Sequence, residues 1–111
     1  MNKLTIIGNL TRDPETRTTS TGSTVCTFTV AVNRRSRSDQ QPEADFFRVS
    51  AWGKLGENCQ RYLAKGLKVA VEGPVIASAY SAPNGTPMAS LEVTAHDVEF
   101  LSSNRGEDGE E

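Results

Sequence analysis

The segment ADFFRVSAWGK, residues 44–54, combines aromatic and basic side chains on one face of an expected β-strand. Side chains alternate between the two faces of a strand. The face suited to a protein core is apolar and consists of Phe47, Val49 and Ala51. The opposite face, which a half-buried strand normally presents to water, carries Phe46, Arg48, Ser50 and Trp52.

Aromatic rings on the solvent side of a strand need a cover, because each ring buries about 150–250 Å² when it packs in a core. The long polar loop that precedes the strand, residues 33–45, is one candidate cover for Phe46 and Trp52, and a second subunit is another. A single nucleic-acid strand is the third option, because bases of any identity stack on aromatic rings with about 1–3 kcal/mol each while cations hold the phosphates. Arg48 lies between the two rings and favours the nucleic acid.

Basic residues cluster directly before and after this strand. The polar stretch NRRSRSDQQPEAD, residues 33–45, has no apolar period and predicts a long loop. It holds the densest group of cations, Arg34, Arg35 and Arg37, and Lys54 follows the strand. The run NRRSR is by itself typical of a solvated loop, but beside a stacking surface it becomes a clamp for phosphates.

Residue patterns for catalysis are weak. His96 is the only histidine and lies in a strand-like context, TAHDV, where a structural role is the simpler interpretation. The glycines follow neither the P-loop nor the dinucleotide spacing. A nuclease needs carboxylates for a metal, and the nearest approach is a set beside three arginines, Asp39, Glu43 and Asp45. We therefore expect a binding protein without enzymatic activity, metal or cofactor.

Hydrophobic periodicity predicts a β-rich chain with one helix. Apolar residues recur at helical spacing over LGENCQRYLAK, residues 55–65. Gly66 is expected to cap this helix, with Lys65 in its last turn. Asn84-Gly85 predicts a tight hairpin turn. Strand patterns cover 3–10, 24–32, 44–54 and 67–73, and the two arms of the hairpin, 75–80 and 88–101.

The order of three strands, one helix and two further strands with a long hairpin predicts an all-β fold. The five-stranded OB-fold barrel has this order and leaves few exposed strand edges. A β-sandwich of short strands is the alternative, although it usually lacks the interposed helix. Residues 1–102 are expected to form this domain, and the acidic residues 103–111 a disordered tail.

Charge and composition set the cellular context. The formal net charge is −2, but the last six residues, GEDGEE, hold four of the 14 acidic residues. No apolar run approaches the roughly 20 residues of a membrane span, and MNKLTIIGNL is too short and too polar for a signal peptide. We therefore expect a cytoplasmic protein whose Cys26 and Cys59 are reduced thiols.

Four segments resemble the bacterial single-stranded DNA-binding protein family, SSB. They are NKLTIIGNLTRDPETR (2–17), TFTVAVNRR (27–35), ADFFRVSAWGKLGENCQRYLAKG (44–66) and VEGPV (71–75). Each is modest alone, but their order and spacing are specific. The resemblance implies an OB-fold that wraps single-stranded DNA without strong sequence preference in replication, recombination and repair. It also implies a nucleoid-associated homotetramer, a dimer of dimers, without catalytic activity or cofactor.

The resemblance also assigns roles to individual residues. Phe46 and Trp52 fall where the family places base-stacking aromatics, and Tyr80 falls at another such position on the first arm of the hairpin. An aromatic that some members carry after AVN is replaced by Ser36. The cations expected to hold phosphates are Lys3, Arg34, Arg35, Arg37, Arg48, Lys54 and Lys65, with Arg17 as a weaker candidate.

Two departures from the family pattern affect binding. Residues 73–91 contain no charged side chain, whereas the same hairpin of many members carries several bases. We therefore expect weaker binding and a shallower dependence on salt. The sequence ends in GEDGEE without the Ile-Pro-Phe tip by which longer members recruit replication and repair proteins, so we expect no recruitment by that route. Such an ending fits a short paralogue, a phage or plasmid member, or a trimmed chain.

Two other functions use the same features. An OB-fold module of a replication or restart complex would dock a protein partner on the aromatic strand. A single-stranded RNA binder would use the same stacking surface and differ in its contacts with the 2′-hydroxyl.

Overall fold

The computed structural model of the protein describes residues 1–34 and 43–102. The predicted contacts of Arg35 and Arg37, the candidate metal ligand Asp39 and the acidic tail 103–111 lie outside these residues. Within them the chain forms eight strands and one helix: β1 (Leu4–Leu10), β2 (Glu15–Thr18), β3 (Thr24–Asn33), β4 (Ala44–Trp52), α1 (Gly53–Tyr62), β5 (Lys68–Gly73), β6 (Val75–Ser81), β7 (Pro87–Thr94) and β8 (Asp97–Phe100).

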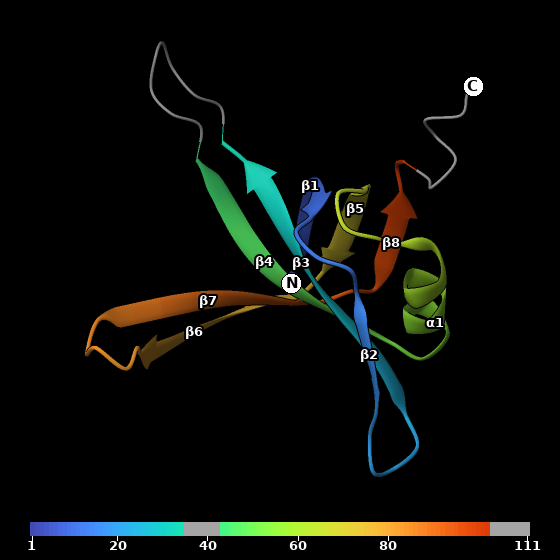
Figure 1. Ribbon diagram of the computed structural model, residues 1–111, viewed down its shortest axis with the longest axis horizontal. Coiled ribbons are helices and arrows are strands. Elements are labelled where there is room, and N and C mark those ends of the chain that lie inside the picture. The colour runs from blue at the N-terminus through green and yellow to red at the C-terminus, as the bar shows by residue number, and fades with distance from the viewer. Residues whose placement is uncertain (35–42, 103–111) are drawn as a thin grey trace.

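All strands belong to one sheet with the order β6-β7-β4-β3-β1-β5-β8, and β2 pairs with β3 (Figure 1). The sheet is antiparallel except between β4 and β7. β6 follows β5 after Pro74 alone, and β8 follows β7 after Ala95 and His96. The two arms of the predicted hairpin therefore each change direction at this point. Beyond it β6 pairs with β7, which also pairs with β4, while on the other side β8 pairs with β5. This architecture confirms the predicted all-β OB-fold.

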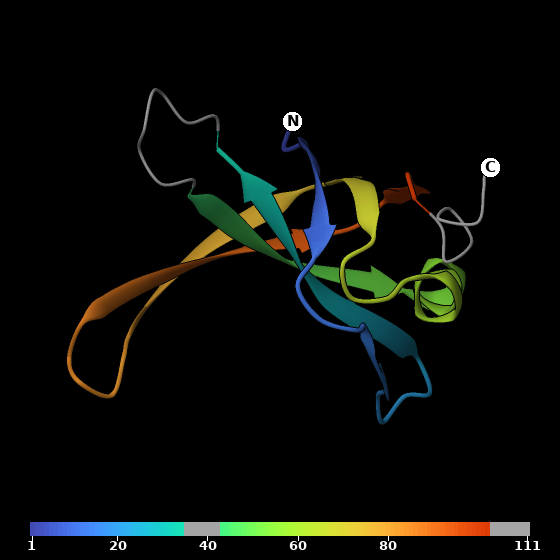
Figure 2. The ribbon, with the colours of Figure 1, turned by 45° about the horizontal axis from the view of Figure 1, so that its top comes forward.

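The core lies inside the curved sheet, and helix α1 packs against it through Cys59. Its largest fully buried side chains are Cys26, Val30, Val49, Cys59, Val69, Val71 and Val93. Gly56 lets the helix approach the sheet closely, because a Cβ at this position would lie 2.3 Å from the carbonyl oxygen of Ala51. Cys26 and Cys59 are free thiols in this core. Figures 1 and 2 both show α1 on the side of the molecule away from the β6–β7 hairpin.

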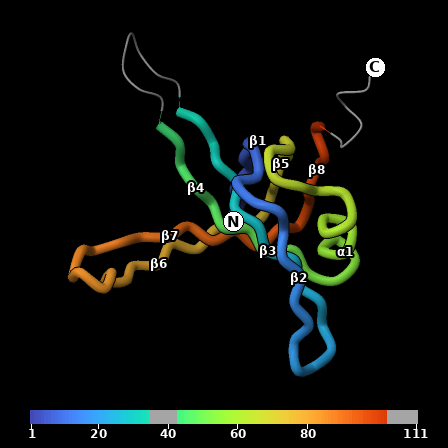
Figure 3. The backbone as a smooth tube through the Cα atoms, viewed as in Figure 1, coloured from blue at the N-terminus to red at the C-terminus, as the bar shows by residue number. Residues whose placement is uncertain are grey.

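The β6–β7 hairpin projects from the body of the protein (Figure 3). Every residue of β6 from Ile76 to Ser81 is exposed, so neither face of this arm packs on the core. By contrast, β4 buries Val49 and Ala51 completely and exposes Phe46 and Trp52. The predicted alternation of β4 is therefore confirmed.

The predicted five strands were too few. Glu15–Thr18 forms β2, whose four residues are all exposed and therefore carry no apolar alternation. This strand exists because it pairs with β3. The predicted strand 88–101 is divided at Ala95 and His96, whose backbone N–H groups donate to the carbonyl oxygens of Ser50 and Glu72. The predicted strand is therefore two strands, β7 paired with β4 and β8 paired with β5.

The predicted end of the helix was wrong. Helix α1 ends at Tyr62, and Leu63 returns to extended backbone because its side chain is drawn into the core. Gly66 has a positive φ of 91° but lies in the turn after the helix, where its N–H donates to the oxygen of Leu10. The cation in the last helical turn is Arg61, not Lys65.

Candidate nucleic-acid interface

The outer face of β4 continues onto both neighbouring strands. Residues that are Cα partners in a ladder share one face of the sheet. Arg48 pairs with Thr29 of β3 on one side and with Glu92 of β7 on the other. Phe46 pairs with Ala31, and the three strands therefore present a single outward surface.

Tyr80 belongs to the same surface although it lies on the projecting hairpin. Glu92 pairs with Ile76 of β6, and Tyr80 follows Ile76 by four residues, an even number that preserves the face. The exposed fractions are 58% for Phe46, 47% for Trp52 and 53% for Tyr80. We call Phe46, Arg48, Trp52 and Tyr80 the aromatic face. Within residues 1–34 and 43–102, no element covers these rings. The part of the predicted loop that lies between residues 35 and 42 is outside the described residues.

The rings of Phe46 and Trp52 are too far apart to hold one base between them. They are six residues apart along β4, which corresponds to about 20 Å of strand. Trp52 lies at the edge of a cavity of about 390 Å³ next to the turn between β2 and β3. Each ring therefore offers a separate stacking position.

Arg17 lies closer to the aromatic face than its weak sequence signal indicated. It pairs with Val25, and Val25 pairs with Trp52, so Arg17 and Trp52 share one row across β2, β3 and β4. Lys54 is exposed in the first turn of α1, two residues after Trp52. These two cations therefore lie near the Trp52 end of the face.

Arg34, which the sequence predicts as a phosphate contact, is already paired with two carboxylates in the structure. Its guanidinium forms ion pairs with Glu43 at 2.8 Å and with Asp45 at 2.7 Å, and so ties the end of β3 to the start of β4. The hydrogen bonds with Arg34 lower the pKa of Asp45, while Asp45 raises the pKa of Arg34. A phosphate at Arg34 has to compete with two carboxylates.

Lys3 and Lys65 lie away from the rows of the aromatic face. Lys3 forms an ion pair of 2.9 Å with Glu72 of β5, and the hydrogen bond with Glu72 raises the pKa of Lys3. Lys65 lies in the turn between α1 and β5, where its backbone N–H donates to Asp13 Oδ1 at 2.8 Å. The contacts predicted for Lys3, Lys65 and Arg34 stay predictions.

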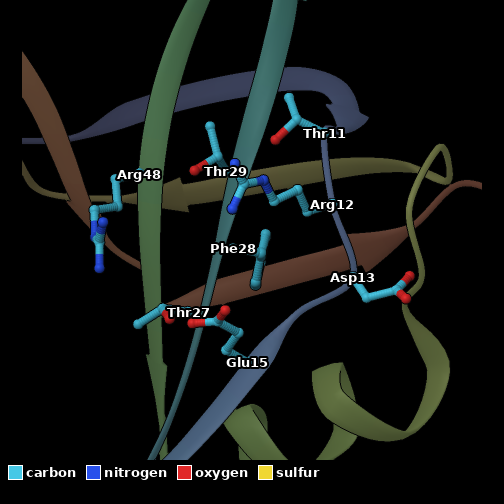
Figure 4. Close-up of a pocket in the computed structure, with 8 residues that line it drawn as sticks. All are labelled: Thr11, Arg12, Asp13, Glu15, Thr27, Phe28, Thr29 and Arg48. Atoms are coloured by element: carbon cyan, nitrogen blue, oxygen red, sulfur yellow. The ribbon is translucent and has the colours of Figure 1, made fainter.

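A cavity of about 340 Å³ opens beside Arg48 and adds a cation that the sequence reading missed (Figure 4). Its lining residues are Thr11, Arg12, Asp13, Glu15, Thr27, Phe28, Thr29 and Arg48. The sequence gives no signal for Arg12, because the segment TRDPETR mixes acidic and basic residues in a turn and has no helical or strand period.

Other kinds of site find no support in residues 1–34 and 43–102. In this part of the chain no three His, Cys, Asp or Glu side chains are grouped as metal ligands. Nor does it contain a helix of the length and hydropathy needed to cross a bilayer. The aromatic face is the main candidate site because its three rings are about half exposed on one surface of the sheet.

An OB-fold with exposed aromatics and cations on one sheet surface defines a class of nucleic-acid-binding proteins. Residues 1–101 match the single-strand binding protein family, and the chain belongs to this family. It is 42% identical over 102 residues to single-stranded DNA-binding protein 3 of Clostridium acetobutylicum, a match that covers 91% of this chain and 71% of the relative.

Two further relatives show the same similarity. The single-stranded DNA-binding protein of Thermotoga maritima is 43% identical over 103 residues, 90% of this chain and 73% of the relative. Single-stranded DNA-binding protein 1 of Clostridium acetobutylicum is 39% identical over 107 residues, 95% of this chain and 97% of the relative. These matches confirm the family that the sequence motifs resembled.

Proposed function

We propose that this protein binds single-stranded DNA without sequence preference and protects it during replication, recombination and repair. The observation that carries the proposal is the aromatic face, where three half-exposed rings share one side of the continuous β4–β7–β6 sheet in a member of the single-strand binding protein family. Stacking is sequence-tolerant because every base has a π-face. The activity is binding rather than catalysis, and it takes place in the cytoplasm.

Individual residues divide the work of binding in this proposal. Phe46, Trp52 and Tyr80 stack bases, while Arg17, Arg48 and Lys54 hold phosphates beside them. Arg35 and Arg37 add charge at the β3–β4 connection. Lys3, Arg34 and Lys65 are secondary, since the first two already face carboxylates.

The protein acts as a homotetramer, arranged as a dimer of dimers. Family membership supports this assembly, as do apolar side chains that are exposed outside the aromatic face, among them Ile7 at 51% and Tyr62 at 48%. Light scattering coupled to size-exclusion chromatography measures the mass directly. A species of four chains is expected, and a monomer at micromolar concentration would contradict the assembly.

Titration of the intrinsic fluorescence with oligo(dT) tests the function, because Trp52 is the only tryptophan. Strong quenching that saturates at a defined number of nucleotides is expected. Failure to quench at low salt would show that Trp52 is covered by protein and that the face docks a partner. Competition with RNA of matched length separates a DNA binder from an RNA binder.

A further inference from the structure

Arg12 and Arg48 approach the same position of β3 from opposite sides. The backbone N–H of Thr11 donates to the oxygen of Thr29 at 3.0 Å, which brings the residue next to it, Arg12, to this strand position. Arg48 is the Cα partner of Thr29 on the other side. Both side chains line the cavity of about 340 Å³, and Figure 4 shows Thr29 between them and Thr11 beside Arg12.

The two guanidinium groups are available for an anion. Among the described residues, neither has a carboxylate within ion-pair distance, in contrast to Arg34 and Lys3. Of the two acids that line the cavity, Asp13 accepts the backbone N–H of Lys65 and points away from β3. Glu15 pairs with Thr27, two residues along β3 from Thr29. Glu92 of β7 is the Cα partner of Arg48 on the side away from Thr29 and forms no ion pair with it. Two guanidinium groups therefore flank Thr29, and the nearby acids Glu15 and Glu92 lie to either side of this position.

This position continues the path of a stacked strand. Arg48 follows Phe46 by two residues on the same face, a separation of about 7 Å along β4. A strand whose base lies on Phe46 therefore carries its backbone past Arg48 and Thr29. Guanidinium groups suit this ligand, since they bind phosphate oxygens through paired, charge-assisted hydrogen bonds.

We infer that Arg12 and Arg48, with the hydroxyl groups of Thr11 and Thr29, form a subsite for the phosphodiester backbone of the bound strand. The inference rests on the proposed function and deepens it by adding Arg12 as a contact that fixes the course of the strand across β3. Glu15 opposes the same phosphate by repulsion.

Arg12→Gln tests the subsite, and Arg61→Gln is its matched control. Arg61 lies in the last turn of α1 over the ring of Tyr62, so its loss changes the net charge equally at a different place. Oligo(dT) affinity is measured by Trp52 quenching at several NaCl concentrations. For Arg12→Gln we expect binding about tenfold weaker at low salt and a log–log salt slope shallower by about 0.7, the value for one phosphate contact on a single strand.

Equal affinity and slope in the Arg12→Gln and Arg61→Gln proteins would overturn the subsite. Failure of the proposed function has a different signature, because the unmodified protein would then fail to bind at all. Glu15→Gln gives a second reading of opposite sign. Removal of its charge is expected to tighten binding about two- to threefold at low salt, and unchanged or weaker binding would show that the phosphate lies elsewhere.

Discussion

Strand β4 and the β6–β7 hairpin both present exposed aromatics on the same side of one sheet, yet they are built differently. β4 has a fully buried opposite face, with Val49 and Ala51 in the core, and cations around its rings. The outer part of the hairpin, from Ile76 to Ser81 on β6 and from Pro87 to Ala89 on β7, is exposed on both faces, and residues 73–91 carry no charge. In the proposed function one DNA strand is held in two ways, by stacking plus charge on β4 and by stacking alone on a projecting arm.

This difference separates the two contributions by their response to salt. Phosphate contacts release counterions, so their contribution falls as salt increases, whereas stacking on uncharged rings does not involve counterions. The salt dependence of binding should therefore originate almost entirely from the β4 side. The affinity that persists at high salt should come from the rings of both regions.

The largest expected effect is at Phe46. Phe46→Ala removes a stacking position on the rigid strand and should cost about 1–3 kcal/mol, or roughly 5- to 150-fold in affinity for oligo(dT). The measurement is Trp52 quenching at constant salt. Phe100→Ala is the control, because Phe100 is a partly exposed aromatic of β8 that contacts Tyr62 instead. Similar losses of affinity in both variants would show that Phe46 of β4 is not a specific stacking position.

Tyr80→Ala should have a smaller effect of about fivefold, because ordering the projecting arm offsets part of the stacking energy. The slope of affinity against salt should not change, since no charge is removed. Tyr80→Phe keeps the ring and should bind like the unmodified protein. A shallower slope in Tyr80→Ala would show that the hairpin also organises phosphate contacts.

Asp45→Asn should increase the salt dependence of binding that originates from the β4 side. The low pKa of Asp45 keeps its ion pair with Arg34 intact at neutral pH. Loss of that charge leaves Glu43 as the remaining ion-pair partner of Arg34 and makes the guanidinium more available to DNA. The salt slope should therefore steepen by less than about 0.7, the value for one full phosphate contact. Glu99→Gln removes the same charge from β8. Identical slopes in the two variants would show that Arg34 does not contact phosphate and only joins the end of β3 to the start of β4.

The smallest expected effect comes from adding a charge to the hairpin. Ser78 shares the face of Tyr80, whereas Ala79 lies on the opposite face, and both are exposed. Ser78→Lys should steepen the salt slope by at most about 0.7, the value for one added phosphate contact. Ala79→Lys adds the same charge and should leave the slope nearly unchanged. Equal steepening would show that DNA does not distinguish the two faces of the arm.

The sequence predicted the parts of the site that depend on local alternation. Phe46, Arg48 and Trp52 were placed correctly on the outer face because they alternate with the apolar residues Phe47, Val49 and Ala51 of the inner face. Tyr80 was placed through the family resemblance, since β6 is exposed on both sides and has no alternation to read.

Features that depend on distant partners were missed. Arg12 lines a cavity only because Thr11 bonds to Thr29, 18 positions later. Arg34 looked like a free cation, yet Glu43 and Asp45 face it across the base of the β3–β4 connection. Strand β2 and the early end of α1 likewise follow from pairing with β3 and from burial of Leu63. No local pattern encodes these contacts.

The central claim is that bases, and not only phosphates, bind to the aromatic face. The most direct test compares oligo(dT) with an abasic deoxyribose-phosphate strand of equal length, using Trp52 quenching and competition at the same salt concentration. The account predicts that the abasic strand binds much more weakly, fails to quench Trp52 and loses nearly all affinity at high salt. Equal affinity for the two strands would contradict the account, because charge alone would then explain binding.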